Sequence, residues 1–255
     1  MRTLKLTLAY DGGAYAGWQS QAGPPSLQGA LEAVLLRITG ETIRVVASGR
    51  TDAGVHALGQ VVSFSTNSDL APERFARALN AWLPRDMAAL SVEEAAPSFD
   101  ARRDAVRKRY RYMIDDGPFA DVFRRWHAWH YRQRLDVDAM RRSARSLIGR
   151  HDFSSYETGG SPRSSSVRSV YALDVERRAA PDANLIWIEI EADGFLYNMV
   201  RTIVGTLVEV GRGARDEAWP GAALAARNRR ATGMTAPPHG LFLVRVEYSR
   251  GKDEG

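Results

Sequence analysis

A short polar segment between two apolar stretches holds the residues best suited to chemistry. Residues 47–64 read ASGRTDAGVHALGQVVSF, in which glycines surround Arg50, Asp52 and His56. In extended backbone Arg50 and Asp52 project to the same side, where the guanidinium would keep the carboxylate ionised and oriented. Such a carboxylate acts as a nucleophile or as a general base. The alternative is an ordinary Asp-Ala-Gly turn with a surface ion pair.

A second candidate lies in the run Lys108-Arg109-Tyr110-Arg111-Tyr112, which we expect in a strand. Side chains of a strand alternate, so Tyr110 and Tyr112 share one face while Arg109 and Arg111 occupy the other. The aromatic face would stack on a nucleobase, which contributes roughly 1–3 kcal/mol, and the basic face would reach phosphates. The alternative is that both tyrosines simply pack within a sheet.

Arg201 is a charged residue beside the apolar stripe of a predicted helix. Leu196, Val200 and Val204 belong to that stripe. A charge so close to an apolar face is seldom buried without a partner, so Arg201 is a candidate to hold a buried acidic group. The alternative is that its long side chain reaches solvent from the helix edge.

Alternating strands and helices are expected to position these residues. Apolar periodicity predicts strands at 2–10, 43–48, 60–66, 87–95, 105–115, 167–177, 185–193 and 241–248. Ser26 and Asp136 can cap helices, and with apolar stripes they predict helices at 26–39, from Pro72, and at 136–148, 196–211 and 216–228. This order indicates an α+β fold with mixed or antiparallel sheets flanked by helices. We expect two subdomains, 1–104 with Asp52 and 105–255 with Tyr110 and Arg201.

The charge of the chain is concentrated in its second half. The net charge is +5, with a net of −2 over residues 1–101 and +7 over residues 102–255. A basic half suggests a polyanionic partner such as nucleic acid, although an Arg-biased genome explains the preference for Arg over Lys equally well. The candidate phosphate contacts are Arg102, Arg103, Arg107, Arg109, Arg111, Arg163, Arg168, Arg227, Arg229 and Arg230.

Several classes of protein are disfavoured by composition. The chain has no Cys, which excludes disulfides and thiolate chemistry. It lacks an apolar run of about 20 residues, and its N-terminus lacks the pattern of a signal peptide, so we expect a cytoplasmic protein without a membrane span. His151 precedes Asp152, but no further ligand stands at metal-binding spacing, so no metal site is expected.

Several ordered segments resemble the tRNA pseudouridine synthase A family. The catalytic segment of that family resembles GRTDAGVHALGQVVSF, whose Asp falls on Asp52 and whose preceding Arg falls on Arg50. The stacking Tyr of a second motif falls on Tyr110, and the Arg partner of the catalytic Asp falls on Arg201. The matching segments are YDGGAYAGWQSQ, FDARRDAVRKRYRY, HDFSSY, GFLYNMVRTIVGTLVEVGRG and TAPPHGLFLVRVEY.

The resemblance implies isomerisation of uridine to pseudouridine at positions 38, 39 and 40 of the tRNA anticodon arm. It implies a homodimer, and a cleft between two subdomains in which a flipped base meets Asp52. Asp52 would attack C1′ or take a proton from C2′, Arg201 would keep it ionised, and Tyr110 would stack on the uracil. Arg50, Arg109, Arg111 and His56 are the further substrate contacts expected. The isomerisation transfers no electrons, so no metal or other cofactor is expected.

Two other functions fit parts of the sequence. A non-catalytic RNA-binding or RNA-folding factor would need the basic surface but not Asp52. A hydrolase using Asp52 with His56 would release uracil or cut the strand, whereas an isomerase leaves the mass of the RNA unchanged. For His56 itself, a structural hydrogen bond beside the glycine turn is the alternative to a substrate contact.

Overall fold

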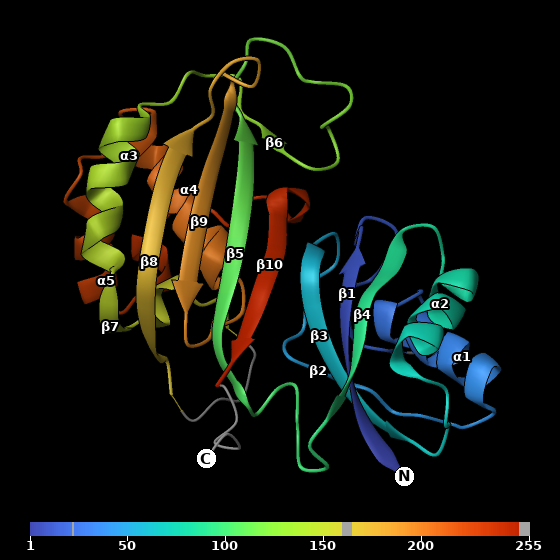
Figure 1. Cartoon of the computed structure of the whole chain (residues 1–255). Helices are drawn as coiled ribbons and strands as arrows, with labels where there is room; N and C mark the ends of the chain where they lie inside the picture. The colour runs from blue at the N-terminus through green and yellow to red at the C-terminus, as the bar shows by residue number, and fades with distance from the viewer. Residues whose placement is uncertain (22, 160–164, 250–255) are drawn as a thin grey trace. The chain divides into compact units, whose positions relative to one another are not determined.

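The structure is a computed structural model that describes residues 1–21, 23–159 and 165–249 (Figure 1). The chain divides into a first unit, Met1–Val106 with Phe242–Gly255, and a second unit, Arg107–Leu241. The sequence placed a boundary after residue 104 and kept the last strand with the second half. In the structure the last strand is grouped with the first unit from Phe242 onward, because Phe242 and Leu243 pair with His56 and Ala57.

The first unit is built on a sheet with the strand order β4-β1-β3-β10. Its β1–β3 and β1–β4 pairs are antiparallel, whereas β3 and β10 run parallel, with Phe242 opposite His56 and Leu243 opposite Ala57. A short strand, β2, adds to β3. The strands are β1 (Arg2–Tyr10), β2 (Val46–Ala47), β3 (His56–Thr66), β4 (Met87–Ala95) and β10 (Leu241–Tyr248).

Two helices of the first unit, α1 (Leu27–Thr39) and α2 (Pro72–Trp82), contact each other, and α2 packs on β4. Ser26 caps α1 as predicted, since its Oγ accepts from the amide of Gly29 at 3.1 Å. Gly40 ends the same helix in the left-handed conformation, with φ of 72°. These local signals therefore fix both ends of α1.

The second unit has an antiparallel sheet with the strand order β5-β9-β8-β7. A two-residue strand, β6, adds in parallel to the end of β5. The strands are β5 (Ala105–Asp115), β6 (Trp129–His130), β7 (Gly149–Asp152), β8 (Val167–Arg177) and β9 (Leu185–Ala192). β6 and β7 were not predicted, because runs this short carry no periodicity.

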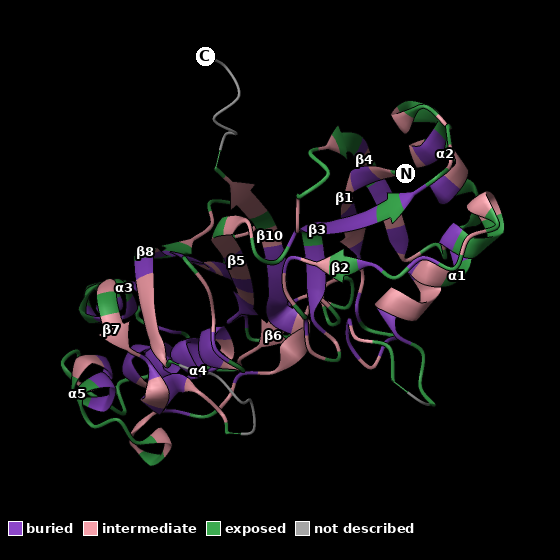
Figure 2. Cartoon of the chain, turned by 90° about the horizontal axis from the view of Figure 1, so that it is seen from below, coloured by how far each residue is buried: buried purple, intermediate pink, exposed green. Residues whose placement is uncertain are grey.

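Three helices of the second unit contact one another: α3 (Val137–Ala144), α4 (Met199–Gly211) and α5 (Trp219–Ala225). Figure 2 shows that α4 is buried along almost its whole length. Short 3-10 turns occupy Arg145–Leu147, Ser154–Tyr156, Arg229–Ala231 and Pro238–Gly240. The α+β class is therefore confirmed, with mixed pairing in the first unit.

Some predicted boundaries were too generous. The strand expected at 43–48 pairs only over Val46–Ala47. The helix expected to start at residue 196 begins at Met199, because Asn198 adopts the left-handed conformation before it. Arg163, one of the candidate phosphate contacts, lies outside the described residues. Among the described residues, no helix is both long and apolar enough to cross a membrane.

Candidate active site

Asp52 lies in a tight turn between β2 and β3. The carbonyl of Asp52 accepts from the amide of Val55 at 3.1 Å, and Gly54 takes a φ of +76° that favours glycine. Asp52 is half-buried, Thr51 before it is buried, and Arg50 is exposed. Asp52 is therefore partly accessible to solvent, and the hydrogen bond across its turn fixes the backbone that holds its carboxylate.

The first loop of the chain, residues 11–25, holds this turn from one side. The amide of Trp18 donates to the carbonyl of Thr51 at 2.9 Å. Gly12 and Gly17 let the two backbones meet, because a Cβ on Gly12 would lie 2.0 Å from the carbonyl oxygen of Val55 and one on Gly17 would lie 2.8 Å from that of Thr51. The loop and the turn thus form one packed piece that needs glycine at both contacts.

His56 is built into the core below this turn. It is 1% exposed, its ring stacks on Phe242 with centroids 4.7 Å apart, and the amide of Gly12 donates to its Nδ1 at 3.1 Å. An oxygen of Asp11 also lies 3.0 Å from Nδ1. A backbone amide can only donate, so Nδ1 offers its lone pair to Gly12 and carries no proton for Asp11. This geometry favours the structural role for His56, and its substrate contact stays a prediction.

Arg201 lies in the first turn of α4 in the second unit, with its guanidinium held in place. Its Nε donates to the carbonyl of Ala236 at 2.7 Å and its Nη1 donates to Oδ1 of Asn198 at 2.8 Å. The residue is half-buried, whereas its helix neighbours Val200 and Thr202 are buried. Two fixed acceptors leave the guanidinium little rotational freedom, so its charge has a defined direction.

Two titratable side chains near Arg201, Tyr112 and His239, have shifted pKa values. Tyr112 is fully buried and its hydroxyl donates to the carbonyl of Pro237 at 2.7 Å. Burial raises the pKa of Tyr112 well above its ordinary value despite the charge of Arg201. Burial also lowers the pKa of His239, and the charges of His127 and Arg201 lower it further. Both groups therefore stay uncharged near pH 7.

Tyr110 is packed rather than free on its strand. Its side chain is 8% exposed. The rings of Tyr110 and Phe195 pack edge to face, with their centroids 5.0 Å apart. It faces Ile190 across the β5–β9 pair. The sequence expected an aromatic face here, and Phe195, which follows β9, extends that face with a ring that sequence reasoning missed.

Arginines 107, 109 and 111 form a ladder of ion pairs across β5 and β9. Arg107 lies 2.8 Å from Glu191, Arg109 donates to the same carboxylate at 2.7 Å, and Arg111 lies 2.6 Å from Glu189. The sequence assigned these three guanidinium groups to phosphates. In the structure they bind acidic side chains, which β9 carries in the alternating segment Glu189-Ile190-Glu191, and their contact with phosphate stays a prediction.

The remaining candidate phosphate contacts fall into two groups. Some are held by the protein itself: Arg103 by Asp104, Arg168 by the carbonyls of Ser165 and Val167, Arg227 by Asp152, and Arg229 by Thr232, Gly233 and Thr235. Arg102 and Arg230 are exposed, and neither has a salt-bridge partner among the described residues. These two are the arginines of the set best placed to meet an anion.

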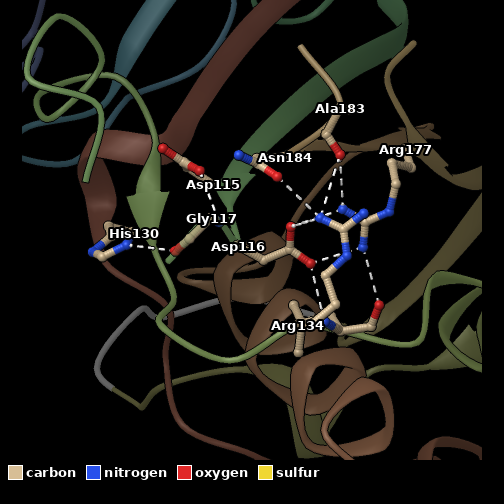
Figure 3. A network of polar contacts seen from close by, with 9 residues as sticks. Asp115, Asp116, Gly117, His130, Arg134, Arg177, Ala183 and Asn184 are labelled. Carbon is tan, nitrogen blue, oxygen red and sulfur yellow. Dashed lines mark hydrogen bonds and ion pairs between the residues drawn. The ribbon is translucent and has the colours of Figure 1, made fainter. Parts of the chain in front are cut away.

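A buried ion cluster around Asp116 was not foreseen. The carboxylate of Asp116 accepts two hydrogen bonds of 2.7 Å from Arg177, one of 3.1 Å from Arg134 and one of 3.0 Å from the amide of Leu135 (Figure 3). Burial alone would raise the pKa of Asp116, but these bonds and the two positive charges hold it below its usual range. The cluster joins the end of β5, β8 and the residues before α3, so it is structural.

A family model and two curated relatives point to the same family. The family model described as tRNA pseudouridine synthase matches residues 7–102 and 143–249. The chain is 53% identical to tRNA pseudouridine synthase A of Moorella thermoacetica, over 97% of this chain and 100% of that protein. It is 47% identical to tRNA pseudouridine synthase A of Brevibacillus brevis, over the same shares. A solved H/ACA RNP bound to a substrate RNA containing 2′-deoxyuridine is 11% identical, covers 96% of this chain and 47% of its own, and has a TM-score of 0.37.

Proposed function

This chain belongs to the tRNA pseudouridine synthase family, and we propose that it isomerises uridine to pseudouridine in the anticodon arm of tRNA, at positions 38, 39 and 40. The observation that carries the proposal is that the sequence is similar, over nearly its whole length, to relatives named tRNA pseudouridine synthase A. Because tRNA is the substrate, we place the reaction in the cytoplasm.

In the proposed reaction the bond between C1′ of the ribose and N1 of the uracil breaks, and a bond between C1′ and C5 forms. The proton on C5 is lost, and N1 gains one, so atoms and electrons balance without a redox partner. Asp52 acts in one of two ways: its carboxylate attacks C1′, or it removes a proton from C2′. Its half-buried position on a glycine-shaped turn supports this role, because a reacting carboxylate needs both fixed direction and access.

Arg201 and Tyr110 take the roles that the family assigns to them. Arg201 is the cation that keeps the catalytic carboxylate ionised, and its support is a guanidinium already oriented by Asn198 and Ala236. Tyr110 stacks on the detached uracil, supported by its place in an aromatic group with Phe195. Arg50, exposed beside Asp52, is the proposed contact to the RNA backbone nearest the reacting nucleotide.

The base reaches Asp52 by leaving its stack, which costs a few kcal/mol. Phosphate contacts offset that cost, and Arg102 and Arg230 are the first arginines we assign to them. Arg109 and Arg111 act on the substrate only indirectly in this proposal, since Glu189 and Glu191 already hold them.

We further propose that the enzyme is a homodimer that uses the loop between β5 and β6. Four large apolar side chains of this loop are strongly exposed: Phe119 by 85%, Val122 by 61%, Phe123 by 89% and Trp126 by 63%. Exposed apolar patches of this kind mark interaction sites. A two-fold interface brings the same patch together from both copies, and an apolar patch complements itself.

The basic residues of the same loop favour a protein partner over RNA. Arg124 pairs with Asp121 and Asp182, and Arg125 donates to the carbonyl of Val122. Both guanidinium groups are therefore engaged with the chain itself, which leaves rings rather than charges on the outside. Light scattering should find a dimer for the natural chain and a monomer for Phe119→Ser with Phe123→Ser, and an unchanged dimer would contradict this assignment.

The test of the catalytic proposal uses purified protein and an unmodified tRNA transcript with nothing else added. Pseudouridine should appear, located by base-resolved chemical mapping, while the mass of the RNA stays constant. Asp52→Asn keeps the shape of the side chain and removes its charge, so it should bind tRNA and form no product. Asp138→Asn removes an exposed carboxylate on α3 and serves as the matched control.

Three outcomes separate the alternatives. Normal turnover by Asp52→Asn would remove Asp52 from the mechanism. Tight tRNA binding without product by the natural chain would favour the non-catalytic RNA-binding factor. Release of free uracil or strand scission would favour the hydrolase.

A further inference from the structure

A network of four buried polar side chains lies under the turn that carries Asp52. Its members are Tyr10 on β1, Ser48 after β2, Thr51 in the turn and Gln60 on β3. They are 4%, 0%, 6% and 0% exposed. Burial of polar groups is unfavourable unless every group is bonded, so the mutual hydrogen bonds of this network are what make its burial tolerable.

Gln60 is the centre of the network, and all parts of its amide are used. Its Nε2 donates to the carbonyl of Gly49 at 2.8 Å and to the hydroxyl of Tyr10 at 3.3 Å. Its Oε1 accepts from Oγ of Ser48 at 2.7 Å. Because the amide nitrogen has no lone pair to offer, the hydroxyl of Tyr10 accepts from it. Tyr10 then gives its own hydrogen to Oγ1 of Thr51, 2.9 Å away.

The two ends of this hydrogen-bond network are Gly49 and Thr51, the residues on either side of the exposed Arg50. Gly49 is bound through its carbonyl, and Thr51 is bound through its side chain from below and through its carbonyl by Trp18 from the first loop. Asp52 is the next residue. Since Thr51 is fixed at two atoms, the peptide unit that leads into Asp52 has one orientation.

We propose that Gln60 and Tyr10 are positioning residues for the reaction: their hydrogen bonds to Gly49 and Thr51 aim the carboxylate of Asp52. This inference rests on the proposed function, because it assumes that Asp52 reacts. Tyr10 donates to Thr51 at all physiological pH values, because burial raises the pKa of Tyr10 to about 12 and its hydroxyl stays neutral.

A network that only stabilised the fold would have different consequences. Its loss would lower the free energy of unfolding but leave the rate of the folded enzyme unchanged. A network that aims Asp52 affects the chemical step, because a displacement of about 1 Å costs about 100-fold in rate. The rate of a single turnover therefore separates the two roles, whereas stability alone does not.

The sharpest variants are at Thr51. Thr51→Val keeps the shape of the side chain and removes the acceptor for Tyr10, whereas Thr51→Ser keeps that acceptor. With enzyme in excess over tRNA, Thr51→Val should slow single-turnover pseudouridine formation by roughly 10- to 100-fold. Its Kd for tRNA should change by less than about twofold, because no phosphate contact is touched. Thr51→Ser should recover most of the rate.

Tyr10→Phe removes the same bond from the opposite side and should slow the reaction in the same way. Tyr156→Phe is its matched control in the second unit: Tyr156 is also fully buried, and its hydroxyl donates to the carbonyl of Pro220 at 2.9 Å and is hydrogen-bonded to the side chain of Thr206. The control should lose similar stability and keep its rate. All rates are measured well below the lowest thermal midpoint of the set, so that every variant is folded.

Natural single-turnover rates for Thr51→Val and Tyr10→Phe would overturn the inference, and so would an equal loss of rate in Tyr156→Phe. Failure of the proposed function looks different, since Asp52→Asn would then be active. An inactive Asp52→Asn together with natural rates for the network variants would overturn only the positioning role.

Discussion

Nη1 of Arg201 donates a 2.8 Å hydrogen bond to Oδ1 of Asn198, three residues earlier in the chain. Asn198 stands immediately before α4 with φ of 60° and ψ of 6°, a left-handed conformation that Asn tolerates better than most residues. One residue therefore meets two requirements: it ends the preceding loop in an unusual backbone conformation, and it holds the guanidinium that the proposed mechanism uses.

Two substitutions at this position separate these requirements. Asn198→Gly removes the side chain but suits the backbone, and Asn198→Ala removes the side chain and retains the strain of a left-handed Ala. We expect Asn198→Ala to be less stable than Asn198→Gly by about 1–2 kcal/mol in urea unfolding. Both should lower the single-turnover rate by a similar factor, because both release Arg201. A natural rate in Asn198→Gly would show that Asn198 acts through the backbone alone.

The contact between Gly12 and Val55 gives a second prediction. A Cβ at residue 12 would lie 2.0 Å from the carbonyl oxygen of Val55, so Gly12→Ala must push the first loop away from the turn of Asp52. We expect a loss of about 1–3 kcal/mol in unfolding free energy and a clear loss of activity in the folded variant. Gly159→Ala is the control, because no atom of the described residues lies within 4 Å of its added Cβ. Equal activity in the two variants would contradict this packing.

Local signals in the sequence were sufficient for the starts of two helices and for most strands. Ser26 and Asp136 were predicted as helix caps, and each accepts a hydrogen bond from an amide three residues later. Such caps depend on a handful of neighbouring residues. Strands β1 and β5 were predicted with their observed bounds, since their alternation reflects one buried face.

The partners of the polar residues could not be predicted in the same way. The pairing of Arg109 with Glu191 was not predicted, because Glu191 lies 82 residues away and meets Arg109 only through the register of β5 and β9. Gln60 reads as an ordinary polar residue of a strand until β1 brings Tyr10 beside it. Register and pairing order are properties of the folded sheet, so these contacts leave no local pattern in the sequence.

The salt dependence of tRNA binding tests the revised assignment of the arginines. Arg102→Ala and Arg230→Ala should each reduce the slope of log Kd against log salt by about 0.7–0.9, the share of one phosphate contact. Arg230→Lys keeps the charge and should restore most of the slope. Arg109→Ala should leave the slope unchanged but lower stability, because the nearly buried Glu191 loses one of its partners. A smaller slope in Arg109→Ala alone would return that residue to the RNA contacts.

The cluster around Asp116 predicts how stability changes with pH. The pKa of Asp116 is lower in the folded chain than in an unfolded one, so its contribution to stability is complete above the unfolded carboxyl pKa of about 4. That contribution is lost as the pH falls from there through the lower folded value. Asp116→Asn removes the charge at every pH and leaves Arg177 without its counter-ion. At pH 7 this variant should be less stable by about 3–5 kcal/mol.

Urea unfolding of the natural chain and of Asp116→Asn at pH 7, 5 and 3 measures this contribution as a difference, which cancels the titration of the other carboxylates. The difference should be the same at pH 7 and pH 5 and smaller at pH 3. Asp138→Asn, whose exposed carboxylate pairs with Arg141, should differ from the natural chain by less than about 1 kcal/mol throughout. A difference for Asp116→Asn that grew toward low pH would mean that the folded chain raises the pKa of this carboxyl, and that burial outweighs Arg177 and Arg134.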